Sequence, residues 1–173
     1  MTDKADVVEA LNAHRGWDIA AEDVCLTTDP DFPDVAVVGV FADDRGCMLE
    51  AILVDGSWLA VEQASQPVLA ARGWPDLDDR GREALALAWA EFGVFAYYGI
   101  AWERGDAFAR ADAPAYSPPS AHADGAGGVV VTLWRIEPQG SLPQTEYALW
   151  QVAFDGDGRQ TGTERLDGYV VVY

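Results

Sequence analysis

Positive charge is scarce in this sequence. Lys4 is the only lysine, ten arginines supply the remaining positive charge, and the net charge is −18 at pH 7. Nucleic acids and anionic membranes are bound through clustered lysine and arginine side chains. The composition therefore argues against direct binding to nucleic acid or to a membrane surface. It permits a protein partner that presents a basic face.

Cysteine and histidine are also scarce. Cys25 and Cys47 are too few for a disulfide framework, and the sequence favours two reduced, partly buried thiols over a single bridge. His14 and His122 belong to no zinc-binding motif, so no metal and no cofactor are expected. The start of the chain has early acidic residues and lacks the apolar core of a secretory signal. The expected compartment is therefore the cytoplasm.

The motifs of common catalytic chemistries are missing as well. No serine lies in a Gly-x-Ser-x-Gly elbow, and no glycine-rich loop joins a strand to a helix where it would hold a phosphate. The segment 155–167 begins like a calcium loop, but Arg159 and Leu166 occupy positions that require oxygen ligands. The sequence therefore assigns no catalytic residue, and it leaves enzyme activity open while leaning against it.

Apolar residues, by contrast, are abundant. Half of the residues are hydrophobic, and seven of the 173 are tryptophan. A chain of this length and composition is expected to build one core, so we predict a single α+β domain over 1–173. The spacing of Val7, Val8 and Leu11 predicts a short N-terminal helix over 5–14.

The longest apolar run covers residues 84–102 and contains one charged residue, Glu91. Apolar residues on most sides predict a helix that is buried on most sides. The run just reaches the length of a bilayer span, but Glu91 lies near its middle and no flanking cations fix an orientation. We therefore predict antiparallel β meanders packed around one long, largely buried helix over about 81–103.

Strand-like segments occur on both sides of this run. Asp-Gly pairs at 55–56 and 167–168 predict tight hairpin turns. The segment 109–128 is rich in Ala, Pro, Ser and Gly, and we expect it to be a flexible loop or linker. The predicted strands cover residues 35–41, 47–54, 57–62, 128–137, 145–154, 159–166 and 168–173.

Negative charge is unevenly distributed, since more than half of the net charge lies in residues 1–75. The first hypothesis is a non-enzymatic acidic binding protein, such as an inhibitor, immunity or antitoxin-like factor that engages a basic protein face. High-GC coding or salt adaptation would give the same acidity without a function. Self-association into a homo-oligomer through 109–128 is a further alternative. The acidic face is predicted at Asp29, Asp31, Asp34, Asp43 and Asp44.

The second hypothesis is a small-molecule binder or an enzyme. A carboxylate in an apolar helix is costly unless it is paired. Glu91 would then be a polar anchor or a general acid or base, assisted by Tyr97 or Tyr98. In the alternative reading Glu91 faces water or pairs with an arginine such as Arg135 or Arg165. The predicted aromatic pocket consists of Trp89, Phe92, Tyr97, Tyr98 and Trp134.

Overall fold

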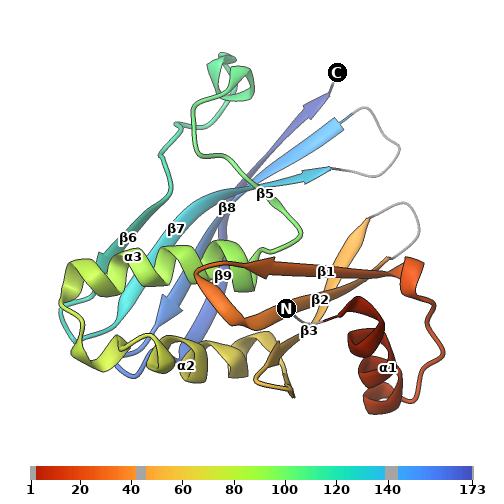
Figure 1. Ribbon diagram of the computed structural model, residues 1–173. Helices are drawn as coiled ribbons and strands as arrows, with labels where there is room; N and C mark the ends of the chain where they lie inside the picture. The colour runs from red at the N-terminus through yellow and green to blue at the C-terminus, as the bar shows by residue number, and fades with distance from the viewer. Residues whose placement is uncertain (1–2, 42–45, 139–143, 173) are drawn as a thin grey trace.

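The computed structural model describes residues 3–41, 46–138 and 144–172 (Figure 1). The fold is mixed α+β, with two antiparallel sheets and three α-helices in the described residues. The first sheet has the order β1-β2-β3-β4, and the second has the order β5-β7-β8-β9 with β6 paired to β7. The coarse fold class predicted from the sequence is confirmed.

The elements have the following bounds. The helices are α1 (Lys4–Arg15), α2 (Val61–Ala71) and α3 (Asp79–Trp89), with 3-10 turns η1 (Ala21–Asp23), η3 (Trp74–Asp76) and η5 (Asp106–Ala109) and a π-helical turn η4 (Ala90–Val94). The strands are β1 (Val24–Asp29), β2 (Phe32–Phe41), β3 (Cys47–Val54), β4 (Ser57–Leu59), β5 (Gly99–Ile100), β6 (Ser120–Ala123), β7 (Val129–Pro138), β8 (Gln144–Phe154) and β9 (Gln160–Val172).

Strand β2 is buried on both of its faces. Val38 packs with Leu11 of α1, while Val35 and Val37 belong to the main core with α2 and α3. Because side chains alternate along a strand, a strand covered by helices on both faces reads as a continuous apolar run. The N-terminal helix itself is confirmed, with Asp3 capping its first turn.

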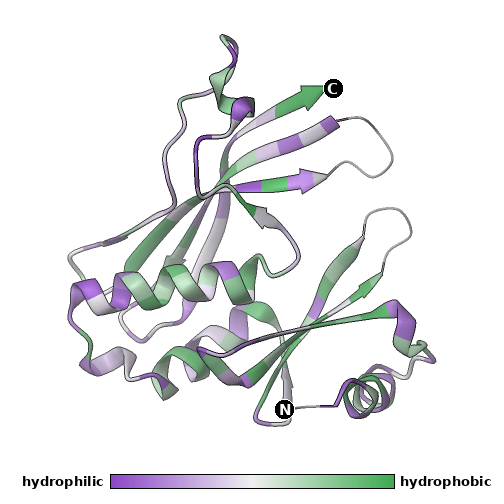
Figure 2. Cartoon of the chain, turned by 45° about the horizontal axis from the view of Figure 1, so that its top comes forward, coloured by the Kyte–Doolittle hydropathy of each residue, from purple (hydrophilic) through white to green (hydrophobic). Residues whose placement is uncertain are grey.

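The central helices α2 and α3 pack against both sheets, so one core joins the two halves of the chain. Trp74 and Trp89 are both 0% exposed in this core. From the second sheet, Val131 and Leu133 of β7 contribute to the same cluster. Figure 2 shows hydrophobic residues along the central helices and the strands behind them.

The predicted long helix over 81–103 is wrong in its second half. Helix α3 continues through η4 and ends at Val94, and the chain then turns and enters β5. A Cβ atom on Gly93 would lie 2.6 Å from the ring of Trp89, so this ring packs over the bare glycine. Most of the apolar run is buried or half-buried, as predicted, but its residues form a helix, a turn and a strand in succession instead of one helix.

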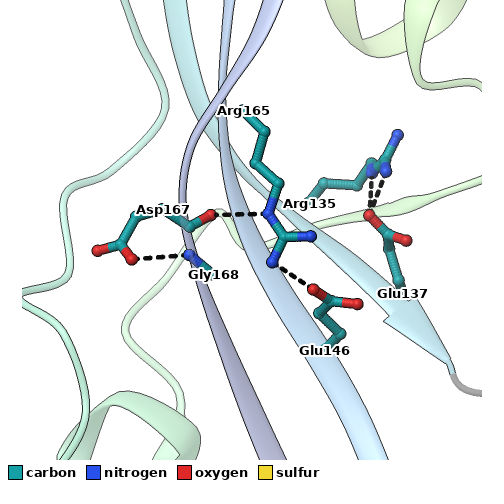
Figure 3. Close-up of polar contacts among 6 residues, drawn as sticks. All are labelled: Arg135, Glu137, Glu146, Arg165, Asp167 and Gly168. Atoms are coloured by element: carbon teal, nitrogen blue, oxygen red, sulfur yellow. Dashed lines mark hydrogen bonds and ion pairs between the residues drawn. The ribbon is translucent and has the colours of Figure 1, made fainter.

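The Asp167-Gly168 pair is not the predicted turn, because β9 is continuous through it. The register between β8 and β9 shifts between Leu149 and Trp150. Leu166 of β9 has no partner residue on β8 at this point and forms a bulge. The Gly168 N–H donates to the Asp167 carboxylate at 2.7 Å (Figure 3). By contrast, the tight turn at 55–56 is confirmed, with positive φ at both of its residues.

Two further segments differ from the prediction. The third strand, predicted over 57–62, ends at Leu59 because α2 begins at Val61. Within 109–128, residues Ser120–Ala123 form β6, which pairs with β7. In the part of the chain that the structure describes, no helix is long and apolar enough to cross a membrane.

Cys25 and Cys47 form a disulfide, so the expectation of two reduced thiols is wrong. Cys25 lies in β1 and Cys47 begins β3, and both strands flank β2. Their Cα atoms are 6.3 Å apart, within the range of protein disulfides. Only the order of the strands brings the two residues together, and their spacing in the sequence carries no such information.

Candidate functional site

A cleft of about 290 Å³ lies between the turn that joins β1 to β2 and the C-terminal end of α3. Figure 1 shows this turn beside α3. We call this cleft the acidic cleft, because three of the residues that line it carry carboxylate side chains. It is lined by Thr27, Asp29, Asp31, Phe32, Ala88, Glu91, Phe92, Ala96 and Tyr98.

The β1–β2 turn supplies two of the carboxylates. Asp29 Oδ1 accepts a hydrogen bond from the backbone N–H of Asp31 at 2.7 Å, which is how aspartate stabilises a turn. Asp31 is exposed, whereas Phe32 is 1% exposed and anchors the turn in the core. Asp29 and Asp31 therefore line the cleft from a turn that Phe32 fixes to the core.

Glu91 supplies the third carboxylate. It is exposed, and its Oε1 accepts a hydrogen bond from the indole N–H of Trp102 at 3.2 Å. Neither arginine suggested from the sequence is its partner, since Arg135 pairs with Glu137 and Arg165 with Glu146 (Figure 3). Glu91 therefore lies at a water-accessible edge of the cleft, in the apolar run but outside the core.

Asp34 differs from Asp29 and Asp31, because Arg72 neutralises it. The Arg72 guanidinium donates to the Asp34 carboxylate, and this hydrogen bond is the main reason why the pKa of Asp34 is lowered. Arg72 also donates to the carbonyl of Asp31 at 3.0 Å and so ties α2 to the turn. The other two members of the predicted acidic face, Asp43 and Asp44, lie outside the described residues.

The five residues of the predicted aromatic pocket are distributed over four places. Phe92 and Tyr98 line the acidic cleft. Trp89 is fully buried in the main core, 6.1 Å from Phe92 between ring centres. Trp134 is also fully buried, but it packs on Phe108 in a separate cluster.

Tyr97 reaches the first sheet instead of the cleft. Its hydroxyl lies 2.7 Å from the carbonyl oxygen of Val37 and 3.0 Å from that of Cys25. A Cβ atom on Gly39 would lie 2.7 Å from the Tyr97 ring, so the glycine makes room for this contact. Tyr97 therefore joins the end of the central helices to β1 and β2, and it has a structural role.

Alkaline pH is expected to destabilise the protein through Tyr97. Burial raises the pKa of Tyr97 to about 12 from its ordinary value of 10.0. The unfolded chain therefore ionises first, and the stabilisation by the neutral hydroxyl is lost as the pH rises from 10 towards 12. At pH 7, Tyr97→Phe should cost about 1 kcal/mol in urea unfolding. This cost should shrink between pH 9 and pH 11.5, and a constant cost would contradict the burial argument.

Several cleft residues were not singled out by the sequence. Thr27, Phe32, Ala88 and Ala96 became visible only when the turn and α3 were placed side by side. The prolines and aspartates of the turn were the available signal, because they mark a loop on the surface. In the described residues, no group of three or more His, Cys, Asp or Glu side chains is arranged to hold a metal ion.

Comparisons with known proteins found no match to a protein-family model, a curated protein or a solved structure.

Proposed function

We propose that this protein is a non-enzymatic binding protein that engages a basic face of a partner protein. In this proposal one arginine or lysine side chain of the partner enters the acidic cleft. Inhibitors, immunity factors and antitoxins are the kinds of protein that act in this way. The proposal joins the two hypotheses from the sequence, because residues from both the acidic face and the aromatic pocket line one cleft.

The observation that carries the proposal is this shared lining. Asp29, Asp31 and Glu91 provide acceptors for a cation, and charge-assisted hydrogen bonds are stronger than neutral ones. Phe92 and Tyr98 line the same cleft and give the aliphatic part of an arginine or lysine side chain an apolar surface to pack on. A cleft of about 290 Å³ suits a single side chain. The net charge of −18 adds long-range attraction for a basic partner.

The setting of this interaction is also a proposal. The sequence favours the cytoplasm, and a location there has to accommodate the disulfide between Cys25 and Cys47. Self-association into a homo-oligomer, and the absence of direct nucleic-acid or membrane binding, follow from the sequence arguments alone. Light scattering measures the first, and a binding assay with DNA and anionic vesicles measures the second.

The proposal predicts that N-acetylarginine amide binds to the acidic cleft and that its neutral isostere, N-acetylcitrulline amide, does not. The indole N–H of Trp102 reports binding in ¹H–¹⁵N spectra, because it donates to Glu91. Asp31→Asn and Glu91→Gln should each weaken binding about fivefold, which corresponds to ~1 kcal/mol for a partly exposed ion pair. Raising the salt concentration should weaken it further.

Glu9→Gln is the matched control, because Glu9 is an exposed carboxylate on α1, outside the cleft. It should bind the arginine probe as well as the unchanged protein does. Equal binding of the arginine and citrulline probes would overturn the selection for a cation. That result would instead favour the small-molecule alternative, in which Glu91 and Tyr98 hold an uncharged ligand.

A further inference from the structure

A second cleft, of about 270 Å³, lies beyond the end of α3 and between the two sheets. We call it the inter-sheet cleft. Leu49 of β3 lines it from the first sheet, Val61 and the exposed Glu62 line it from α2, and Trp150 of β8 and Gln160 of β9 line it from the second sheet. Figures 1 and 2 show strands β2, β3, β7 and β8 extending past α3 toward the same side of the molecule.

Arg135 of β7 lines this cleft with a guanidinium group that lies between two aromatic rings. Its guanidinium carbon lies 4.0 Å from the ring centre of Tyr98 and 4.3 Å from that of Trp150, so both rings hold it in place. The charge is balanced by Glu137, which accepts from Arg135 Nε at 2.7 Å and also from Nη2 (Figure 3). The Nη1 group donates to no residue among those that the structure describes. Arg135 therefore offers hydrogen-bond donors from a neutralised pair.

Two other polar groups of the cleft have no hydrogen-bond partner within the described residues. They are the indole N–H of Trp150, a donor, and the side-chain oxygen of Gln160, an acceptor. Gln160 is only 8% exposed, and its amide nitrogen is already bonded to Thr163. Buried polar groups are nearly always hydrogen-bonded, so two in one cleft call for an explanation. Both atoms are covered in the protein as it stands, so a ligand that supplies one acceptor and one donor would satisfy them once the two side chains turn toward the cleft.

We propose that the inter-sheet cleft binds a small uncharged aromatic amide. The carbonyl oxygen accepts from Trp150 and from Arg135 Nη1, a donor group of the ligand meets Gln160, and the ring packs on Leu49 and Val61. The ligand is uncharged because Glu137 already balances Arg135, so an added anion lacks a counter-charge in a protein of net charge −18. A cation that paired with Glu62 would still lie against the hydrogen-bond donors of Arg135 and Trp150, which offer it no acceptor.

This site is separate from the acidic cleft, and each can be tested without the other. Tyr98 lines both clefts and is therefore left unchanged. The probe is 4-hydroxybenzamide, whose hydroxyl and carbonyl lie at opposite ends of one ring. Its near-isosteres 4-hydroxybenzoate and 4-hydroxybenzamidine carry a negative and a positive charge. Trp150 reports the inter-sheet cleft and Trp102 the acidic cleft, each indole signal being assigned by its loss in the phenylalanine variant.

In ¹H–¹⁵N spectra of the intact protein, 4-hydroxybenzamide should shift the Trp150 indole signal saturably and leave the Trp102 signal in place. The benzoate should bind at least about tenfold more weakly at this site, and so should the benzamidine. Ligand-observed NMR should give about fivefold weaker binding to Trp150→Phe and to Gln160→Met, the range expected for one lost hydrogen bond. Trp102→Phe is the control and should bind normally.

The absence of a saturable Trp150 shift, or equal affinity of all three probes, would overturn the proposal. Unchanged affinity in both Trp150→Phe and Gln160→Met would overturn it as well. The two variants remove different polar atoms, so either one that retains a dispersed spectrum is sufficient for the test. A failure here leaves the arginine probe and the acidic cleft unaffected, because those are read from Trp102.

Discussion

Replacing Trp74 by alanine is expected to lower the free energy of unfolding by about 4 kcal/mol, within the range for a fully buried tryptophan. Trp74 is 0% exposed and lies between α2 and α3 in the sequence. Its indole N–H donates to the carbonyl of Gly156 at 3.0 Å, which joins η3 to the turn between β8 and β9. Arg82 donates to the Trp74 carbonyl at 3.1 Å, so the same residue also fixes the start of α3.

A pair of matched substitutions separates the hydrogen bond from the packing. Trp74 and Trp89 are both 0% exposed, but the Trp89 indole N–H has no partner among the described residues. Trp74→Phe removes a hydrogen-bonded donor, whereas Trp89→Phe removes a donor that has no partner in the described residues. We therefore expect Trp74→Phe to be the more destabilising by about 1–2 kcal/mol in urea unfolding. Equal losses would show that packing alone decides the stability.

The sequence predicted those elements whose signals are local. The N-terminal helix predicted over 5–14 forms α1, and Asp3 and Gly16 beside it act as its caps in the structure. Residues 47–54 were predicted as a strand and form β3 with those bounds. In each case the residues within or beside the element determine it, through capping or turn chemistry.

The predictions from the sequence were wrong where contacts with residues distant in the sequence determine the local structure. The apolar run after Val94 leaves the helix because Tyr97 bonds to the first sheet and Tyr98 packs on Arg135 of the second. No local pattern contains those partners. The Asp167-Gly168 pair continues β9 instead of turning, because β8 is long enough to pair with both residues, and the bulge lies at Leu166.

In the candidate site, too, the local features could be predicted from the sequence but their arrangement in space could not. Acidity near residue 30 and aromatic residues near 90 were both visible in the sequence, and each suggested a separate function. Only the packing of the β1–β2 turn beside α3 puts Asp31 and Glu91 in one cleft. Asp34 was grouped with Asp31 by proximity in the sequence, although Arg72 of the distant α2 neutralises it. Charge pattern locates acidic residues, but tertiary contacts determine which of them are available to a ligand.

Reduction of the Cys25–Cys47 disulfide is expected to lower the free energy of unfolding by about 3 kcal/mol, the loop-entropy value for cysteines separated by 22 positions. The bond links β1 to β3, which are not paired with each other because β2 lies between them. It therefore adds a connection that the backbone hydrogen bonds of the sheet do not provide.

Urea unfolding with and without dithiothreitol measures the effect, and the double variant Cys25→Ser/Cys47→Ser is the control that should not respond to reductant. An unchanged midpoint for the native protein, or two free thiols on alkylation before reduction, would contradict the prediction. The result also bears on the compartment. A bond worth about 3 kcal/mol persists where the surroundings are oxidising and is lost where glutathione keeps thiols reduced. Alkylation trapping in intact cells therefore tests whether the form that acts on a partner is the disulfide-bonded one or the less stable reduced one.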